Sequence, residues 1–281
     1  MSVLKPYGTL LVYFVFFVMV IVLYNKYSES FSSNRRIIVI TPTYRRITRM
    51  PDITRMSNTL KQIKNLHWIV IEDGEELVPA VQNVLERSGL PYTYVTHKTA
   101  KGYPAKGWYQ RDMALKMLRT NSSQILGNHK GEAVVYFADD DNSYDLRLFD
   151  DFIRNVKKLG VWAVGLVGGT IVEAPKVENK KVTSFNVKWE PSRPFAVDMA
   201  GFAINLKYIL RSAAVFGPKC HGSGAPETCL LEKLGFELDD IQPFGYEKEE
   251  DKEILVWHTR TSIPKSGISV EDDFGYFVEV G

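Results

Sequence analysis

Strand-like and helix-like segments alternate along the first half of this chain, and this alternation constrains the fold more than any other feature. The strand-like runs are residues 37–40, 67–71, 91–97 and 134–138, and the segments with helical spacing of apolar residues are 53–63, 77–87 and 108–118. Alternating strands and helices of this length are typical of parallel sheets with helical crossovers. The sequence therefore predicts an α/β fold with a mostly parallel central sheet and helices on both faces.

Three consecutive carboxylates, Asp139, Asp140 and Asp141, follow the fourth of these strands. Ligands of open α/β sheets bind beyond the carboxyl ends of strands, so these acids lie where a ligand site is expected. Two like charges about 4 Å apart repel by roughly 4 kcal/mol at an effective dielectric constant near 20, so crowded carboxylates need water or a cation. The segment is compatible with a solvated acidic loop and with a site for a hard divalent metal.

The first and second strands also end in polar or aromatic residues, namely Tyr44 and Asp73. Because the carboxyl ends of parallel strands meet at one edge of a sheet, these residues and the three aspartates are predicted to converge on a nucleotide site. The chain contains neither a GxGxxG fingerprint nor a GxxxxGK[ST] loop, which argues against dinucleotide and P-loop chemistry.

The N-terminus has the length and composition of a membrane anchor. Residues 6–25 carry no charge and are mostly apolar, and about 20 apolar residues span a bilayer. Ser28 and Ser30 offer only a weak cleavage site, so an uncleaved anchor is favoured over a signal peptide. We expect residues 1–6 to form a short cytosolic tail, 7–25 a transmembrane signal-anchor, 26–35 a short stem and 36–281 a luminal domain.

Charge and cysteine content exclude several classes of protein. The net charge is only +2 and no basic stripe is present, so no nucleic-acid partner is expected. The two cysteines, Cys220 and Cys229, are too few for a zinc site of thiolates; they form either a disulfide in an oxidising lumen or two buried thiols. Asn121 begins an N-glycosylation sequon in a predicted surface turn, which matters only if the domain is luminal.

The second half of the chain changes character. Residues 160–169 are strand-like and glycine-rich, and residues 182–189 alternate as a hairpin strand does. Residues 189–202 form an irregular stretch that combines aromatic side chains with Arg193 and Asp198. This composition suits a sugar-binding surface. A tight loop packed on the core would explain Phe195 and Phe202 but not Arg193 together with Asp198.

Two further segments carry candidate functional groups. Residues 225–234 are predicted to be helical with Glu227 in the first turn, where the helix dipole favours an acid, so its default role is structural. Residues 254–257 form a predicted strand that runs into His258 and Arg260. Both of these side chains can donate hydrogen bonds to a phosphate.

Taken in order, these segments resemble the β-1,3-glucuronosyltransferases of glycosyltransferase family 43, from residue 36 to the C-terminus. The matching motifs are Thr41-Pro42-Thr43-Tyr44, residues 67–73, Gln110-Arg111, the aspartate trio, Glu173-Ala174-Pro175, residues 193–202, Glu227 and residues 257–261. The resemblance implies a GT-A type fold, a single-pass type II Golgi membrane enzyme, Mn²⁺ and usually a homodimer. It also implies inverting transfer from UDP-glucuronate to the 3-hydroxyl of a terminal galactose. The acceptor stays open between a galactosylgalactosylxylosylprotein and an N-acetyllactosamine-type glycan.

The resemblance also assigns roles to individual residues. On the donor side, the residues that would hold uracil and ribose are Pro42, Thr43, Tyr44 and Asp73. The residues that would contact ribose and the donor sugar are Asp139, Asp140 and Asp198. The residues that would donate to the phosphates are His258, Thr259 and Arg260. Asp141 would bind the metal, and Arg111 would hold the donor carboxylate, because a guanidinium matches a carboxylate bidentately. Glu227 becomes the general base in place of a helix cap. The acceptor is assigned to Glu173, Trp189 and Arg193.

Two positions depart from the family pattern. Lys106 stands where the family usually has arginine, which keeps the charge but loses the bidentate fork. Asp112 replaces an asparagine beside Arg111, where a carboxylate would partly neutralise the group meant to hold glucuronate. These departures leave open a relative with another UDP-sugar donor, a catalytically impaired nucleotide-sugar-binding protein, and a membrane-anchored partner of an active paralogue.

Overall fold

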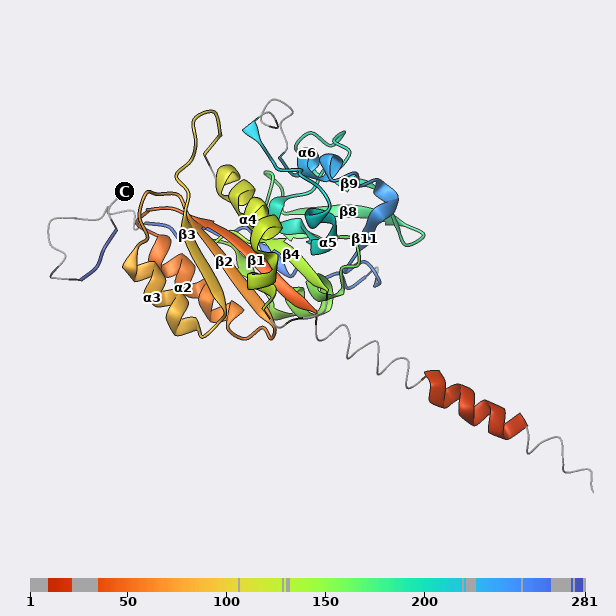
Figure 1. Cartoon of the computed structure of the whole chain (residues 1–281). Coiled ribbons are helices and arrows are strands. Elements are labelled where there is room, and N and C mark those ends of the chain that lie inside the picture. The colour runs from red at the N-terminus through yellow and green to blue at the C-terminus, as the bar shows by residue number, and fades with distance from the viewer. Residues whose placement is uncertain are drawn as a thin grey trace, which may run out of the picture. The chain divides into compact units, whose positions relative to one another are not determined.

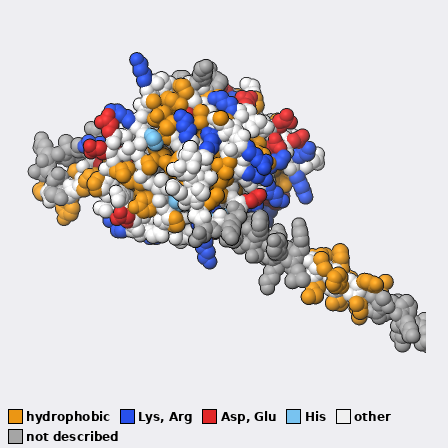
Figure 2. Space-filling model, in the orientation of Figure 1, with side chains coloured by type: hydrophobic (Ala, Val, Ile, Leu, Met, Phe, Trp, Pro, Cys, Tyr) orange, Lys and Arg blue, Asp and Glu red, His pale blue; other side chains and the backbone are white. Residues whose placement is uncertain are grey.

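The computed structural model of the chain describes residues 10–21, 35–105, 107–127, 129, 132–218, 220, 226–248, 250–263, 274 and 276–279. Contacts divide the chain into two units, residues 1–35 and residues 36–281. In the first unit, residues 10–21 are helical, and their side chains are hydrophobic and exposed (Figure 2). Among the described residues, no helix combines the length and hydropathy needed to cross a bilayer. Residues 7–9 and 22–25 of the predicted anchor lie outside the described part.

A seven-stranded mixed sheet forms the centre of the second unit, in the order β11-β6-β10-β4-β1-β2-β3 (Figure 1). Its strands are β1 (Arg36–Thr43), β2 (Leu66–Glu72), β3 (Tyr92–Thr96), β4 (Ala133–Phe137), β6 (Leu159–Val161), β10 (Phe202–Asn205) and β11 (Ile241–Pro243). Only β10 runs antiparallel to its neighbours. The predicted α/β fold and the four strands of the first half, β1 to β4, are confirmed.

The carboxyl ends of β1, β2 and β4 lie at one edge of this sheet. Ile40 of β1 pairs with Ile69 of β2 and with Phe137 of β4, so the three strands advance in register. Beyond the strand ends, the amide of Asp73 donates to the carbonyl of Thr43 over 2.8 Å. The segments that follow the three strands therefore share one edge, as the alternation of elements predicts.

Helices cover both faces of the sheet because successive strand residues point to opposite faces. The helices of this unit are α2 (Arg49–Leu60), α3 (Pro79–Ser88), α4 (Trp108–Leu126), α5 (Leu206–Leu210) and α6 (Pro226–Lys233). On one face Ile37 packs in a core with Met56 of α2 and Val81 of α3. On the other face Ile38 packs in a core with Leu115 of α4. Figure 1 shows α2 and α3 together on one side and α4 apart from them.

A second, five-stranded sheet is built mainly from the second half of the chain, in the order β5-β12-β7-β8-β9. Its strands are β5 (Ser143–Tyr144), β12 (Val256–Trp257), β7 (Val164–Gly165), β8 (Val172–Glu178) and β9 (Lys181–Asn186). The strand-like, glycine-rich segment 160–169 contributes two short strands, one to each sheet. The segment breaks into β6 and β7, and the amide of Leu166 donates to the carbonyl of Ile171 to close a turn.

Short helical turns complete the unit. They are a π-helix at Leu148–Phe152 and 3₁₀ turns at Ile153–Asn155, Met199–Gly201 and Leu238–Asp240. The sequon residue Asn121 does not lie in a surface turn as predicted. It is exposed within α4, at a local kink with φ −123° and ψ 20°, because α4 continues beyond residue 118 to Leu126.

Candidate active site

A cavity of about 340 Å³ opens at the carboxyl edge of the central sheet. Its walls come from the segments after β1, β2 and β4 and from the start of α4. The lining residues are Pro42, Thr43, Tyr44, Arg46, Asp73, Ala105, Gly107, Gln110, Arg111, Asp139, Asp140 and Asp141. The structure thus brings together the residues at the three strand ends that the sequence singled out, and adds Arg111 from α4.

Gly107 allows α4 to approach the end of β1 closely. Its φ is +77°, and a Cβ at this position would lie 2.6 Å from the Cβ of Pro42. Any L-residue here would be strained and would displace the cavity wall. The Gly107 carbonyl also accepts a hydrogen bond from the amide of Arg111 over 3.0 Å. Lys106, the preceding residue and a predicted donor ligand, lies outside the described residues.

The carboxylates of the trio have different partners. Asp139 forms an ion pair with the buried Arg111. Asp140 accepts a hydrogen bond from Thr43 Oγ1 over 2.8 Å, and its two oxygens receive the guanidinium fork of Arg46 over 2.7 and 3.1 Å. Two of the three charges are therefore balanced within the protein, which reduces the repulsion expected from the sequence.

Asp141 is the remaining member of the trio and lines the cavity. Its carboxylate has no ion pair among the described residues, and burial together with the charge of Asp139 raises its pKa. Its backbone carbonyl is fixed by Arg55 and by Thr259 Oγ1, each at 2.6 Å. Within the described part of the chain no three acidic, histidine or cysteine residues gather to enclose a metal. A cation at Asp141 would therefore take most of its ligands from phosphate and water, which is compatible with a hard divalent ion.

Arg46 is a site residue that the sequence reasoning missed. Its guanidinium lies 4.9 Å from the ring centroid of Tyr44, which is within the range of a cation–π interaction. The same group also pairs with Asp52 of α2 at 3.0 Å. The available signal was the pair Arg45-Arg46 directly after Tyr44, at a strand end predicted to face three carboxylates.

The Asp73 carboxylate is held in place at the end of β2. One of its oxygens accepts from the amide of Thr99 and the other from Thr99 Oγ1, both over 2.7 Å. Gln110 of α4 donates to Thr99 Oγ1 over 3.1 Å and to the carbonyl of His97 over 2.7 Å. This network forms a fixed wall between β2 and α4.

A second set of ionisable groups gathers around Asp198. Its Oδ1 lies 2.9 Å from Nε2 of His258 and accepts from the amide of Ala200 over 2.8 Å. Burial lowers the pKa of His258, but the hydrogen bond and charge of Asp198, with the charges of Asp139 and Asp141, outweigh burial and raise that pKa. Because these groups favour the protonated imidazole, His258 is suited to binding an anion.

Glu227 lies in the first turn of α6, as predicted. Burial is the main cause that raises its pKa to about 7, and the charge of Asp198 adds to this effect, while Arg111 and Arg193 oppose it. A carboxyl with a pKa near neutrality can accept a proton and release it again, which is the property required of a general base. The charges of Arg111 in the donor cavity and of Arg193 in the predicted acceptor region therefore both act on the Glu227 carboxyl.

The predicted acceptor residues lie beside this second set. Glu173 is buried, and burial followed by the charge of Asp198 raises its pKa. The guanidinium of Arg193 lies 4.4 Å from the ring centroid of Trp189, whose side chain is 44% exposed. An exposed ring beside charged groups suits the apolar face and the hydroxyls of a sugar.

The three residues predicted to bind phosphate, His258, Thr259 and Arg260, are not among those that line the cavity. Arg260 is exposed. The Thr259 hydroxyl donates to the Asp141 carbonyl and lies 3.1 Å from Ser143 Oγ. It therefore helps to fix the backbone of Asp141.

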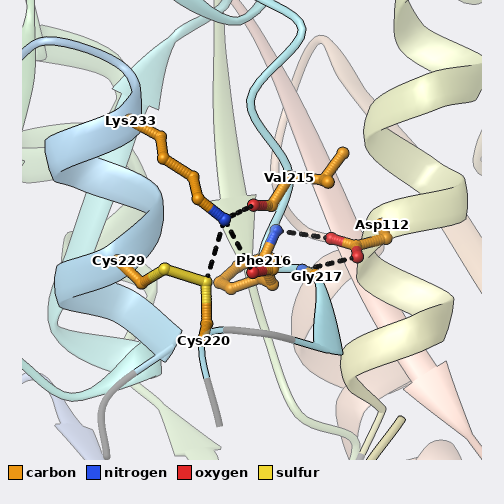
Figure 3. Close-up of a disulfide and its surroundings, with 7 residues drawn as sticks. All are labelled: Asp112, Val215, Phe216, Gly217, Cys220, Cys229 and Lys233. Atoms are coloured by element: carbon orange, nitrogen blue, oxygen red, sulfur yellow. Dashed lines mark hydrogen bonds between the residues drawn. A yellow bond between two sulfur atoms is a disulfide. The ribbon is translucent and has the colours of Figure 1, made fainter. Parts of the chain in front are cut away.

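Asp112 does not neutralise Arg111, contrary to the expectation from the sequence. Asp112 is not among the residues that line the cavity. Its carboxylate accepts hydrogen bonds from the backbone amides of Phe216 and Gly217 (Figure 3). Its environment is buried, and no ion pair joins it to Arg111. Of the two alternatives for the cysteines, the structure has the disulfide, between Cys220 and Cys229.

Comparisons with known proteins agree with this geometry. Residues 56–262 match the sequence profile of glycosyltransferase family 43. The chain is 40% identical over 240 residues to galactosylgalactosylxylosylprotein 3-beta-glucuronosyltransferase sqv-8 of Caenorhabditis elegans, covering 82% of this chain and 65% of that protein. It is 41% identical over 238 residues to the Homo sapiens galactosylgalactosylxylosylprotein 3-beta-glucuronosyltransferase 1, covering 80% of this chain and 69% of that protein. The chain thus spans about two thirds of the length of these relatives.

The fold is also similar to that of a solved structure of distant sequence. The S. aureus TarS fragment 1–349 superposes with a TM-score of 0.51 at 17% identity, covering 80% of this chain and 60% of that chain. The likeness concerns the fold alone, and the assignment comes from the sequence relatives and the family profile, which spans most of residues 36–281. The chain belongs to glycosyltransferase family 43.

Proposed function

We propose that this chain transfers glucuronate from UDP-glucuronate to the 3-hydroxyl of a terminal galactose on a glycoconjugate, with inversion at the anomeric carbon. The observation that carries the proposal is the convergence of Tyr44, Asp73 and Arg111 with the aspartate trio in one cavity at the carboxyl edge of the sheet, in a chain of glycosyltransferase family 43. The names of the C. elegans and human relatives support glucuronyl transfer.

The cavity supplies the donor site in this proposal. Tyr44 and Asp73 contact uracil and ribose at the ends of β1 and β2, where both line the cavity. Arg111 receives the glucuronate carboxylate and exchanges part of its pairing with Asp139 for it, since a guanidinium can serve both anions. His258 donates to the diphosphate because Asp198 favours the protonated imidazole.

Asp141 holds the metal, and a bound Mn²⁺ supplies Lewis-acid stabilisation of the charge that develops on the departing diphosphate. The support for this assignment is that Asp141 is the trio member without an ion pair among the described residues. The residues that balance Asp139 and Asp140 leave this single carboxylate to face the cation.

Glu227 acts as the general base. Its carboxylate takes the proton of the acceptor 3-hydroxyl as the oxygen attacks the anomeric carbon, and the bond to UDP breaks with its electron pair leaving on the phosphate oxygen. Attack from the face opposite UDP gives inversion. Glu173, Trp189 and Arg193 orient the galactose for this attack.

The setting of the reaction is also a proposal. We infer a type II Golgi membrane protein anchored by residues 7–25, with residues 36–281 in the lumen, and a homodimer. The Cys220–Cys229 disulfide supports an oxidising compartment, and Asn121 is exposed for glycosylation. Light scattering of the detergent-solubilised protein would test the dimer, and glycosidase treatment would test modification of Asn121.

The full-length protein assayed against donor and acceptor panels tests the function. We expect transfer from UDP-glucuronate to galactose-terminated acceptors, loss of transfer in EDTA and restoration by Mn²⁺, with an inverted anomeric configuration by NMR. UDP binding without transfer to any acceptor would favour a catalytically impaired relative. Transfer from another UDP-sugar with no activity toward UDP-glucuronate would contradict the donor assignment.

A further inference from the structure

The buried carboxylate of Asp112 on α4 binds the chain segment before α6, to which Arg119 of α4 also donates at the Ala214 carbonyl. One of its oxygens accepts from the amide of Phe216 over 2.6 Å, and the other accepts from the amide of Gly217 over 2.8 Å (Figure 3). Asp112 itself is fully buried on α4. Two successive backbone N–H groups are therefore held by a single side chain, which fixes the position of residues 216–217 against α4.

The same segment is fastened to α6 on its other side. Cys220 is buried and bonded to Cys229 of α6. Lys233, also from α6, donates to the carbonyls of Val215 over 3.2 Å and Phe216 over 3.3 Å, and its Nζ lies 3.1 Å from Cys220 Sγ (Figure 3). A covalent bond and two hydrogen bonds thus join α6 to the segment that Asp112 holds.

These contacts connect the donor cavity to the proposed base. Glu227 precedes Cys229 by two residues in the first turn of α6. Arg111, which pairs with Asp139 in the cavity, directly precedes Asp112 on α4. The path from one site to the other therefore runs from α4 through residues 215–217 and the disulfide to α6.

We propose that Asp112 is a positioning residue for Glu227, which it places relative to the donor cavity through residues 216–217 and the Cys220–Cys229 disulfide. The inference rests on the proposed function, in which Glu227 is the base. It also gives a physical reason for aspartate at position 112. An asparagine has only one acceptor oxygen, so its amide nitrogen would face one of the two N–H groups, leaving buried donors unpaired.

Asp112→Asn in the full-length protein tests the proposal, with Asp239→Asn as the matched control. Asp239 is exposed and pairs with Lys181 on the surface. We expect Asp112→Asn to lower kcat about 10- to 100-fold, since small displacements of reacting groups have effects of this size. The donor KM and the UDP dissociation constant should stay within about twofold, and the acid limb of the pH–rate profile should move because the surroundings of Glu227 change. Asp239→Asn should leave all four quantities unchanged.

The disulfide provides a second variant that does not depend on the folding of Asp112→Asn. Cys220→Ser with Cys229→Ser should reproduce the kcat loss and the shift of the pH profile. Combining it with Asp112→Asn should add little, because both changes interrupt one path. Wild-type kcat in the disulfide-free protein, or full additivity of the two changes, would overturn the proposal.

A structural readout separates this inference from the proposed function. If the wild-type protein binds UDP and transfers no sugar, the proposed function fails. The positioning claim is then decided by NMR titration of the Glu227 carboxyl and by hydrogen exchange of residues 226–233. Asp112→Asn should shift that titration and increase exchange in α6, while Asp239→Asn should do neither. An unchanged titration in folded Asp112→Asn refutes the positioning role.

Discussion

Asp198 and His258 are 60 residues apart in sequence, yet Oδ1 of the aspartate lies 2.9 Å from Nε2 of the histidine. Asp198 precedes the 3₁₀ turn at residues 199–201, and His258 directly follows β12, so the pair joins the two sheets. Burial is the main cause that raises the pKa values of Glu227 and Glu173, and the charge of Asp198 adds to it. One carboxylate thus favours a protonated histidine and disfavours ionisation of two neighbouring acids.

Replacing Asp198 with asparagine should therefore lower the pKa values of both His258 and Glu227. Without its charge the pKa of His258 falls, so less cationic imidazole is available at neutral pH, and the pKa of Glu227 also falls. We expect UDP affinity to weaken about tenfold, as loss of a hydrogen bond to a charged group costs about 1.5 kcal/mol or more. The acid limb of the pH–rate profile should move to lower pH. Calorimetric UDP titration and kcat against pH test both effects, and an acid limb that moves upward would contradict the coupling.

The raised pKa of Glu227 gives a direct pH dependence. A general base works in its ionised form, so kcat should decline as the pH falls through about 7 and should reach a plateau above it. Glu227→Gln keeps the side-chain volume and removes the base, and it should lower kcat on the order of 10²–10⁴-fold while UDP binding stays near normal. If Glu227 were only a helix cap, the glutamine variant would lose about 0.3–1 kcal/mol of stability and keep its turnover.

Asp141 should control the dependence of nucleotide binding on metal. Asp141→Ala is expected to abolish transfer and to remove the enhancement of UDP affinity by Mn²⁺, because no other carboxylate of the trio lacks a cationic partner among the described residues. Asp145→Ala serves as the control because it replaces another aspartate close by in sequence. Asp145 forms an ion pair with Arg147 and is not among the residues that line the cavity. Calorimetry with and without Mn²⁺ measures the difference. Equal Mn²⁺ enhancement in wild type and Asp141→Ala would exclude this metal site.

Glu279, near the end of the sequence, should contribute to stability through its ion pair with the buried Arg49. Arg49 of α2 is fully buried between Glu72 at 2.5 Å and Glu279, whose Oε2 accepts from Nε over 2.7 Å. Glu279→Gln should lower the free energy of unfolding by about 1.5–3 kcal/mol, the range for hydrogen bonds to charged groups. Glu178→Gln disrupts the exposed pair with Lys176 and should cost about 1 kcal/mol or less. Urea denaturation measures the loss of stability in each variant. Equal losses in Glu279→Gln and Glu178→Gln would show that the contact between Arg49 and Glu279 is not maintained in solution.

The sequence determined the architecture of the first half and the place of the candidate site. The spacing of apolar residues that marks each strand and helix is a local property of the sequence. Parallel pairing of β1 with β2 and β4 then brings the carboxyl ends of these strands to one edge of the sheet. Asp139 to Asp141, Tyr44 and Asp73 could be assigned to that edge without coordinates. The first-turn position of Glu227 was likewise predicted from the pattern of its helix.

The tertiary structure decided which of these groups are neutralised and which are left reactive. Arg46 comes from the loop after β1, yet it pairs with Asp140 near the end of β4, a contact between residues 94 positions apart. Asp112 was expected to neutralise part of the charge of Arg111. Instead, its carboxylate accepts hydrogen bonds from the backbone amides of Phe216 and Gly217, which are 104 and 105 residues away in sequence. Ion pairing and hydrogen bonding depend on distances of a few ångströms between distant parts of the chain, which local sequence patterns do not specify.

Burial was the second property that only the folded structure decided. Glu227 reads from the sequence as an ordinary helix-terminal acid, but burial and the charge of Asp198 raise its pKa to about 7. Desolvation is a sum over everything packed around a group, so it follows from the complete fold and not from the residue's neighbours in sequence. The sequence thus determined which residues lie at the site, and the tertiary structure determined their protonation and charge balance.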